Sequence, residues 1–173
     1  MLAVLIGCGL RRSEVAKLGF RHVQRREGRW VVVDLIGKHG RVRSVPMAGE
    51  TKTAIDEWTS AAEIQSGRVF RPINKGGRLT HEFLTEKCVW SVVRKYAIKA
   101  GLSNVAPHDL RRSYARLTRQ GGAPLEQIQL SLGHASIQTT EVYLGSKQNL
   151  KKAPCDYLNL AWESFIGNGE QAA

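Results

Sequence analysis

The sequence predicts an α+β fold, in which a mainly helical domain carries a small antiparallel β-sheet near its N-terminus. Two β-rich runs, RWVVVDLIG and RVRSVPM, flank the segment GKHG, a pattern typical of a β-hairpin. Over much of the remaining chain apolar residues recur at helical spacing, and glycines or prolines separate these segments. A length of 173 residues is sufficient for one domain with a substantial core, or for two very small domains.

The N-terminal half is expected to contain three helices besides the hairpin. Residues 1–8 are apolar and end before Gly9, which predicts a buried helix too short to span a bilayer. Ser13 is expected to cap a second short helix, SEVAKL, with Glu14 in its first turn, where the helix dipole favours an acid. Residues 50–62 form the third, and the basic, glycine-rich stretch GRVFRPINKGGR after it predicts a loop.

The C-terminal half is expected to be helical, with local start and stop signals. Residues 85–100 show helical spacing, Pro107 suits the first turn of the helix HDLRRSYARLTRQ, and Pro124 begins a helix that ends at Gly133. Ser136 is expected to cap IQTTEVYL. A last amphipathic helix is predicted from an apolar stripe: Leu158, Ala161, Trp162, Phe165 and Ile166.

Charge is the unusual feature of the composition. The 26 Lys and Arg residues exceed the 15 Asp and Glu residues and give a net charge of +11. Such an excess favours a polyanionic partner, usually nucleic acid, although a merely soluble basic protein would look the same. The three cysteines form no C-x-x-C motif, so they indicate reduced thiols rather than a disulfide framework or a zinc site.

Four short motifs contain the residues that could carry chemistry: GCGLRRSE, GKHGRVR, HDLRR and LGHASIQTTEVY. Each has an ordinary explanation: a solvated arginine pair, a lysine that keeps a hairpin tip soluble, a surface His–Arg pair, and a structural histidine or tyrosine. His108 and Arg111 are three residues apart and share a helix face, and a donor in the first turn of that helix suits a bound anion.

Taken together and in this order, the motifs resemble the catalytic domain of the tyrosine recombinases, the phage integrase family. GLRRSE is similar to the first arginine box of that family, GKHGR to its hairpin lysine, HDLRRS to its His-x-x-Arg box, and LGHASIQTTEVY to the box that ends in the nucleophile. The resemblance covers roughly residues 1–150 and implies a catalytic set that works without a metal or another cofactor: Arg11, Lys38, His108, Arg111, His134 and Tyr143.

The resemblance implies a role for each residue of this set. Tyr143 would attack a DNA phosphodiester and form a 3′-phosphotyrosyl link, while Arg11, Arg111 and His134 would stabilise the phosphate oxygens. Lys38 would protonate the departing 5′ oxygen, and His108 would accept or relay the tyrosine proton. Glu14 is expected to support Arg11. Further basic residues are expected on DNA, or for two of them (Arg12 and Arg112) alternatively in salt bridges: Arg12, Arg41, Arg43, Lys75, Arg78 and Arg112.

The implied partner is double-stranded DNA, in the cytoplasm of a bacterium or a phage-infected cell, and no membrane is expected. In full-length relatives the enzyme forms a tetramer on DNA, and here the helix at 156–166 would either mediate self-association or fold back.

We expect a catalytic domain over 1–166, partial at its N-terminus, with a flexible tail at 167–173 and no N-terminal DNA-clamping domain. Two alternatives stay open: a DNA-binding remnant without turnover, and a type IB topoisomerase with a similar residue set.

Overall fold

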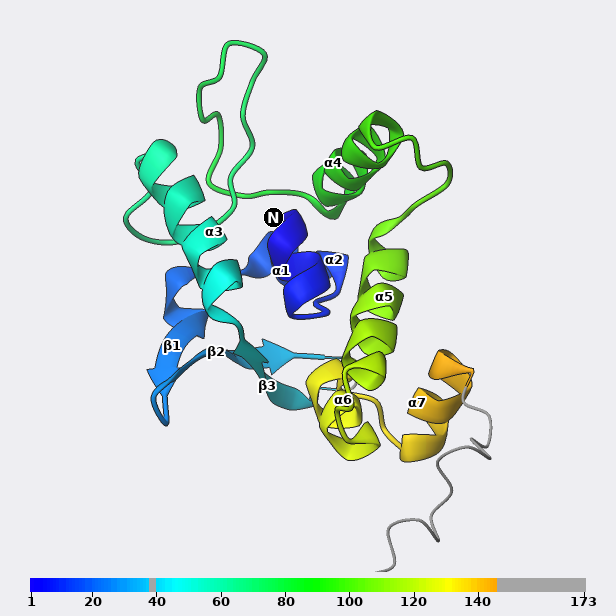
Figure 1. Cartoon of the computed structure of the whole chain (residues 1–173). Coiled ribbons are helices and arrows are strands. Elements are labelled where there is room, and N and C mark those ends of the chain that lie inside the picture. Colours follow the sequence, from blue (N-terminus) through cyan, green and yellow to red (C-terminus); the bar gives the residue numbers. More distant parts are fainter. Residues whose placement is uncertain (38–39, 146–173) are drawn as a thin grey trace, which may run out of the picture.

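The computed structural model describes residues 1–37 and 40–145, and these form a helical body with one small sheet (Figure 1). The sheet contains β1 (Val23–Arg26), β2 (Arg29–Ile36) and β3 (Val42–Met47), all antiparallel, in the order β1-β2-β3. The predicted hairpin is β2–β3, and its base is closed by a hydrogen bond from the amide of Gly37 to the carbonyl of Arg41 at 2.7 Å. Strand β1 was not predicted from the sequence.

Helices make up most of the described residues. Their bounds are α1 (Leu2–Gly7), α2 (Arg12–Lys17), α3 (Gly49–Ala61), α4 (Glu86–Lys99), α5 (Pro107–Gln120), α6 (Leu125–Leu132) and α7 (Ile137–Leu144), with a short 3-10 turn over Phe20–His22. Every helix predicted within these residues is present, and Pro107 begins α5 as expected. The mixed helical architecture with one antiparallel sheet confirms the predicted fold class. The predicted helix at 156–166 lies outside the described residues, as does Lys38.

The N-cap of α2 differs from the prediction. Arg11, not Ser13, is the N-cap, and the carboxylate of Glu14 accepts a hydrogen bond from the Arg11 amide at 2.7 Å. The acid at the third helical position therefore satisfies a free amide at the helix start, which the Ser13 hydroxyl was expected to do. This contact also fixes the direction of the Glu14 side chain.

Two hydrophobic clusters hold the body together. The larger one joins α1, α2, the sheet, α3 and α4, with Leu5, Leu10 and Phe70 among its fully buried side chains. The smaller one consists of Ala115, Ile128 and Leu132, against which Tyr143 of α7 packs. Helix α5 contacts α1, and α6 contacts β3, so the two clusters meet along this seam (Figure 1). None of the helices over 1–37 and 40–145 is long and apolar enough to cross a bilayer.

Candidate active site

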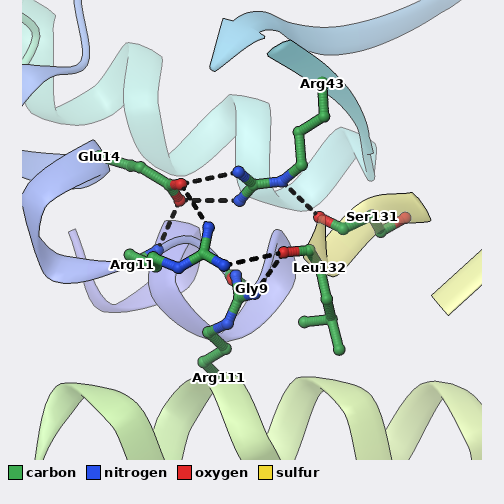
Figure 2. Close-up of polar contacts among 7 residues, drawn as sticks. All are labelled: Gly9, Arg11, Glu14, Arg43, Arg111, Ser131 and Leu132. Carbon is green, nitrogen blue, oxygen red and sulfur yellow. Dashed lines mark hydrogen bonds and ion pairs between the residues drawn. The ribbon is translucent and has the colours of Figure 1, made fainter. Parts of the chain in front are cut away.

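A buried carboxylate lies at the centre of the seam and binds two arginines (Figure 2). Oε1 of Glu14 accepts from Nη1 of Arg43 at 2.7 Å and from Nη1 of Arg11 at 2.9 Å, while Oε2 accepts from Nη2 of Arg43 at 2.8 Å. The Nε of Arg43 donates to the Ser131 carbonyl at 2.8 Å. One carboxylate thus orients a guanidinium from the loop before α2 and another from β3.

Arg111 lies beside this cluster and is almost completely buried, with 2% of its surface exposed. Its Nη1 donates to the Gly9 carbonyl at 2.6 Å, and its Nη2 donates to the Leu132 carbonyl. The same Leu132 carbonyl accepts a longer hydrogen bond, 3.4 Å, from Nη2 of Arg11. The end of α6 therefore holds both predicted catalytic arginines, Arg11 and Arg111, next to each other (Figure 2).

The protonation states of this cluster follow from its surroundings. Burial and the neighbouring charges of Arg11 and Arg43 lower the pKa of Arg111 to about 10, so it stays cationic at neutral pH. Burial alone would raise the pKa of Glu14, but its hydrogen bond with Arg43 and the charges of Arg43 and Arg11 hold the pKa below its ordinary value. Three cations and one anion give this seam a net positive charge.

Two glycines allow the close approach of these groups. Gly9 has φ +58°, and a Cβ there would lie 2.5 Å from the Tyr114 ring, so a larger residue would have to shift the backbone whose carbonyl accepts from Arg111. Gly133 caps α6 in the left-handed conformation with φ +65°, and a Cβ there would lie 2.7 Å from Cδ of Arg43. This turn places His134 directly after the arginine cluster.

Tyr143 on α7 lies between two histidines. Its ring contacts that of His108 edge-on, with centroids 5.5 Å apart, and that of His134 in the same way at 5.2 Å. The guanidinium carbon of Arg112 lies 5.6 Å from the centre of the Tyr143 ring. The Tyr143 hydroxyl is buried and has no hydrogen-bond partner within the described residues. A buried phenol without a hydrogen bond of normal geometry is rare in folded proteins, and a catalytic role is one explanation for it. Arg112 is close enough to favour the ionised form of this phenol.

Both histidines of this site are neutral at physiological pH. Burial, followed by the positive charges of Arg111, Arg11 and Arg43, lowers the pKa of His134 to about 4. Burial and the charges of Arg112 and Arg111 also lower the pKa of His108. Burial raises the pKa of Tyr143, although Arg111 and Arg112 oppose the shift, so Tyr143 rests as a phenol and needs a base to become a nucleophile.

The structure thus brings together five of the six residues predicted to be catalytic: Arg11, His108, Arg111, His134 and Tyr143. Lys38 lies outside the described residues. Glu14 contacts Arg11 as expected, but its stronger partner is Arg43. An arrangement of fixed cations, two neutral imidazoles and a phenol can bind an anionic group and transfer a proton beside it.

Arg43 requires a correction. It was expected to contact DNA, but its side chain is 8% exposed and its three nitrogens all donate within the protein, to Glu14 and Ser131. Alternation along β3 gave no indication of this, because the acceptors are 29 and 88 residues away in the sequence. Arg43 is therefore part of the scaffold that positions Arg11.

The other basic residues expected on DNA are exposed. Arg12 forms an exposed ion pair with Glu86 at 2.8 Å, which is the salt-bridge alternative for this residue. Arg112 is exposed beside Tyr143, and Arg41 is exposed where the hairpin closes. Lys75 and Arg78 lie at a tight turn between Ile73 and Leu79 in the protruding loop between α3 and α4 (Figure 1).

Comparison with known proteins identifies the family of the chain. The model of the phage integrase family matches residues 1–149, so the chain belongs to that family. Among curated relatives, the tyrosine recombinase XerC of Roseiflexus castenholzii is 35% identical over 145 residues, which cover 83% of this chain and 45% of the relative. The tyrosine recombinase XerA of Pyrococcus furiosus is 32% identical over 167 residues, covering 96% and 56%. The chain spans about half the length of these relatives.

Solved structures share the fold. The crystal structure of XerA recombinase has a TM-score of 0.67 and 24% identity and covers 84% of this chain and 52% of that one. The XerH site-specific recombinase, solved as a pre-cleavage complex with its difH substrate, has a TM-score of 0.66 and 22% identity, covering 87% and 43%. The fold is therefore that of the tyrosine recombinases, as predicted.

Proposed function

We propose that this chain cleaves and rejoins DNA, with Tyr143 as the nucleophile that forms a 3′-phosphotyrosyl intermediate. The observation that carries the proposal is the buried Tyr143 hydroxyl, which has no hydrogen-bond partner within the described residues and belongs to a ring held between His108 and His134. A structural tyrosine would normally satisfy its hydroxyl with a protein group. A phosphate at this position would instead place phosphorus beside the phenol.

The reaction is a transesterification in which charge and bonds balance without an external energy source. The Tyr143 oxygen bonds to phosphorus, the bond from phosphorus to the 5′ oxygen of the next nucleotide breaks, and the tyrosine proton is accepted by a base. His108 suits that role because it is neutral and its ring lies against Tyr143. Because a phenol has a pKa of about 10, the phosphotyrosyl link remains reactive toward a 5′ hydroxyl, which reverses the step.

The arginine cluster supports the same reaction electrostatically. Negative charge accumulates on the non-bridging oxygens as tyrosine attacks, and preorganised cations stabilise it most effectively. The Arg11 side chain is one-third exposed, which makes it accessible to a phosphate. Arg111 uses two of its five N–H donors on backbone carbonyls, so it retains donors and a full charge near the same place. His134 would contribute one further hydrogen bond.

Lys38 would act as the general acid that protonates the departing 5′ oxygen, as its place in the GKHG motif implies. Double-stranded DNA would be held by phosphate contacts from the exposed arginines and lysines: Arg12, Arg41, Lys75, Arg78 and Arg112. Self-association through residues 156–166 and a tetramer on DNA belong to the same proposal.

Trapping of a covalent adduct tests the proposal. A library of duplexes with randomised sequence is incubated with the chain and denatured in detergent. Each duplex is nicked so that cleavage releases a short fragment carrying the new 5′ hydroxyl, which diffuses away. We expect a detergent-stable protein–DNA band with the wild type and with Tyr114→Phe, a neighbouring tyrosine that packs on the same small cluster. Tyr143→Phe should bind DNA equally well and give no adduct. An equal adduct yield from Tyr143→Phe would refute the proposal.

A further inference from the structure

The side chain of Thr140 lies directly behind His134. Thr140 is on α7, three residues before Tyr143, and is completely buried. Its hydroxyl oxygen lies 2.9 Å from Nδ1 of His134. Within the described part of the chain, this is the only hydrogen bond of the Thr140 hydroxyl. Thr140 therefore contacts the ring of a proposed catalytic residue through the nitrogen that determines the ring's tautomer.

Three other threonines within helices behave differently. The hydroxyls of Thr53, Thr59 and Thr118 each donate to the backbone carbonyl four residues earlier, at 3.1, 3.1 and 2.8 Å. This back-bonding is the usual solution for a threonine inside a helix. Thr140 has no such bond, although the carbonyl of Ser136 stands four residues before it. Its hydroxyl is turned toward the imidazole instead.

The direction of the Thr140–His134 hydrogen bond follows from counting donors and acceptors. A hydroxyl has one hydrogen to donate, and a buried hydroxyl that donates to nothing is costly. Because Nδ1 is the only hydrogen-bond partner of this hydroxyl among the described residues, that hydrogen must go to Nδ1, which then has to be the unprotonated nitrogen. We propose that Thr140 is a positioning residue that holds neutral His134 as the tautomer protonated at Nε2.

This tautomer matters for the proposed reaction, on which the inference rests. With Nδ1 occupied as an acceptor, the Nε2–H is the one donor that the neutral ring offers to a phosphate oxygen. The opposite tautomer would present a lone pair to an anion and repel it. The lowered pKa of His134 agrees, because a ring that stays neutral cannot donate from both nitrogens. Thr140 would thus keep His134 ready as a donor before DNA arrives.

Long-range ¹H–¹⁵N spectra of the uniformly ¹⁵N-labelled full chain at neutral pH test the tautomer without relying on activity. The His134 signal is assigned by its loss in His134→Gln. We expect an unprotonated Nδ1 and a protonated Nε2 in the wild type and in Thr140→Ser, which keeps the hydroxyl. Thr140→Val should show a mixture of tautomers, and Thr59→Val, which removes a different buried hydroxyl, should leave the spectrum unchanged.

A wild-type ring protonated at Nδ1 would overturn the inference, and so would a Thr140→Val spectrum that matches the wild type. If Thr140→Val does not fold, the wild-type spectrum still tests the tautomer, and Thr140→Ala, which also removes the hydroxyl, replaces it as the test of the positioning role. In the adduct assay we expect Thr140→Val to slow cleavage about tenfold, the scale of one neutral hydrogen bond, and Thr140→Ser to restore the rate. Absence of any adduct, with the expected tautomer in the spectra, would contradict the proposed function but not the role of Thr140 in positioning His134.

Discussion

Arg43 and Glu14 form a buried bidentate ion pair, with Nη1–Oε1 and Nη2–Oε2 distances of 2.7 and 2.8 Å, that connects strand β3 to helix α2 (Figure 2). The same carboxylate binds Arg11, and Arg43 also binds the Ser131 carbonyl at the end of α6. The start of α2, strand β3 and the end of α6 are thus joined through Glu14 and Arg43. The pair determines where Arg11 can lie.

Breaking this ion pair should destabilise the fold strongly. Arg43→Met leaves the buried Glu14 carboxylate with one cation instead of two, and we expect a loss of about 3–5 kcal/mol in the free energy of unfolding. Urea denaturation measures it. Arg12→Gln is the matched control, because the exposed Arg12–Glu86 pair should contribute about 1 kcal/mol or less. Equal losses in the two variants would show that Arg43 has no structural role.

Substitution of Gly133 by alanine should destabilise the fold more than the same substitution of Gly145. Both glycines cap a helix at nearly the same φ, +65° and +62°. A Cβ on Gly145 would meet no atom of the described residues within 4 Å, while one on Gly133 would lie 2.7 Å from Cδ of Arg43. Gly145→Ala should therefore cost roughly 1–2 kcal/mol for the backbone alone. Gly133→Ala should lower the free energy of unfolding by roughly 1 kcal/mol more than Gly145→Ala, because its Cβ also collides with Arg43.

Thermal or urea unfolding of the two alanine variants gives the comparison. If Gly133→Ala lowers the free energy of unfolding no more than Gly145→Ala does, then Arg43 moves aside freely. Arg43 would then not hold Arg11 in a fixed position.

Local signals explain why much of the fold was predictable. Thr85 and Ser136 cap α4 and α7 through hydrogen bonds from Cys88 and Thr139, at 3.2 and 3.3 Å, and such caps depend only on neighbouring residues. Ser13 was wrongly expected to cap α2 because Glu14, at the third helical position, reaches back to the Arg11 amide. The two side chains compete for the same end of the helix, and the sequence does not show which one prevails.

The site was predictable only where its residues lie in recognisable motifs. The ordered boxes indicated Arg11, His108, Arg111, His134 and Tyr143, but the contacts that hold them are long-range. Arg111 binds a carbonyl 102 residues away, and backbone carbonyls leave no trace in the sequence. Arg43 was misassigned for that reason. Thr140 was missed although it lies only six residues from His134, because a threonine within a helix usually bonds to the backbone of its own helix.

Protonation of His134 should oppose folding in mildly acidic solution. Its folded pKa of about 4 lies below the ordinary value of 6.5, so between these pH values the unfolded chain binds a proton that the folded chain does not. The contribution of neutral His134 to the free energy of unfolding should thus be fully present above pH 6.5. It should decline as the pH falls toward 4. An NMR titration of the His134 ring should have its midpoint near pH 4. A midpoint near 6.5 would contradict the described burial.

The proposed role of Lys38 as general acid predicts selective chemical rescue. Lys38→Ala should slow cleavage of ordinary DNA by roughly 10²–10⁴-fold, the range of general-acid contributions. A substrate with a bridging 5′ phosphorothiolate has a leaving group that needs no proton, so the variant should cleave it far better. Lys75→Ala, in the exposed loop between α3 and α4, should show no such preference. Equal defects of Lys38→Ala on both substrates would mean that Lys38 only binds DNA.

The covalent site itself gives the most direct test. Trypsin cuts after Lys and Arg, and residues 120–147 form one tryptic peptide in which Tyr143 is the only tyrosine. After nuclease treatment of the trapped adduct, mass spectrometry should find the 3′-phosphonucleotide remnant on this peptide and none on peptides that contain Tyr96, Tyr114 or Tyr157. A remnant on any of those three tyrosines would contradict Tyr143 as the nucleophile.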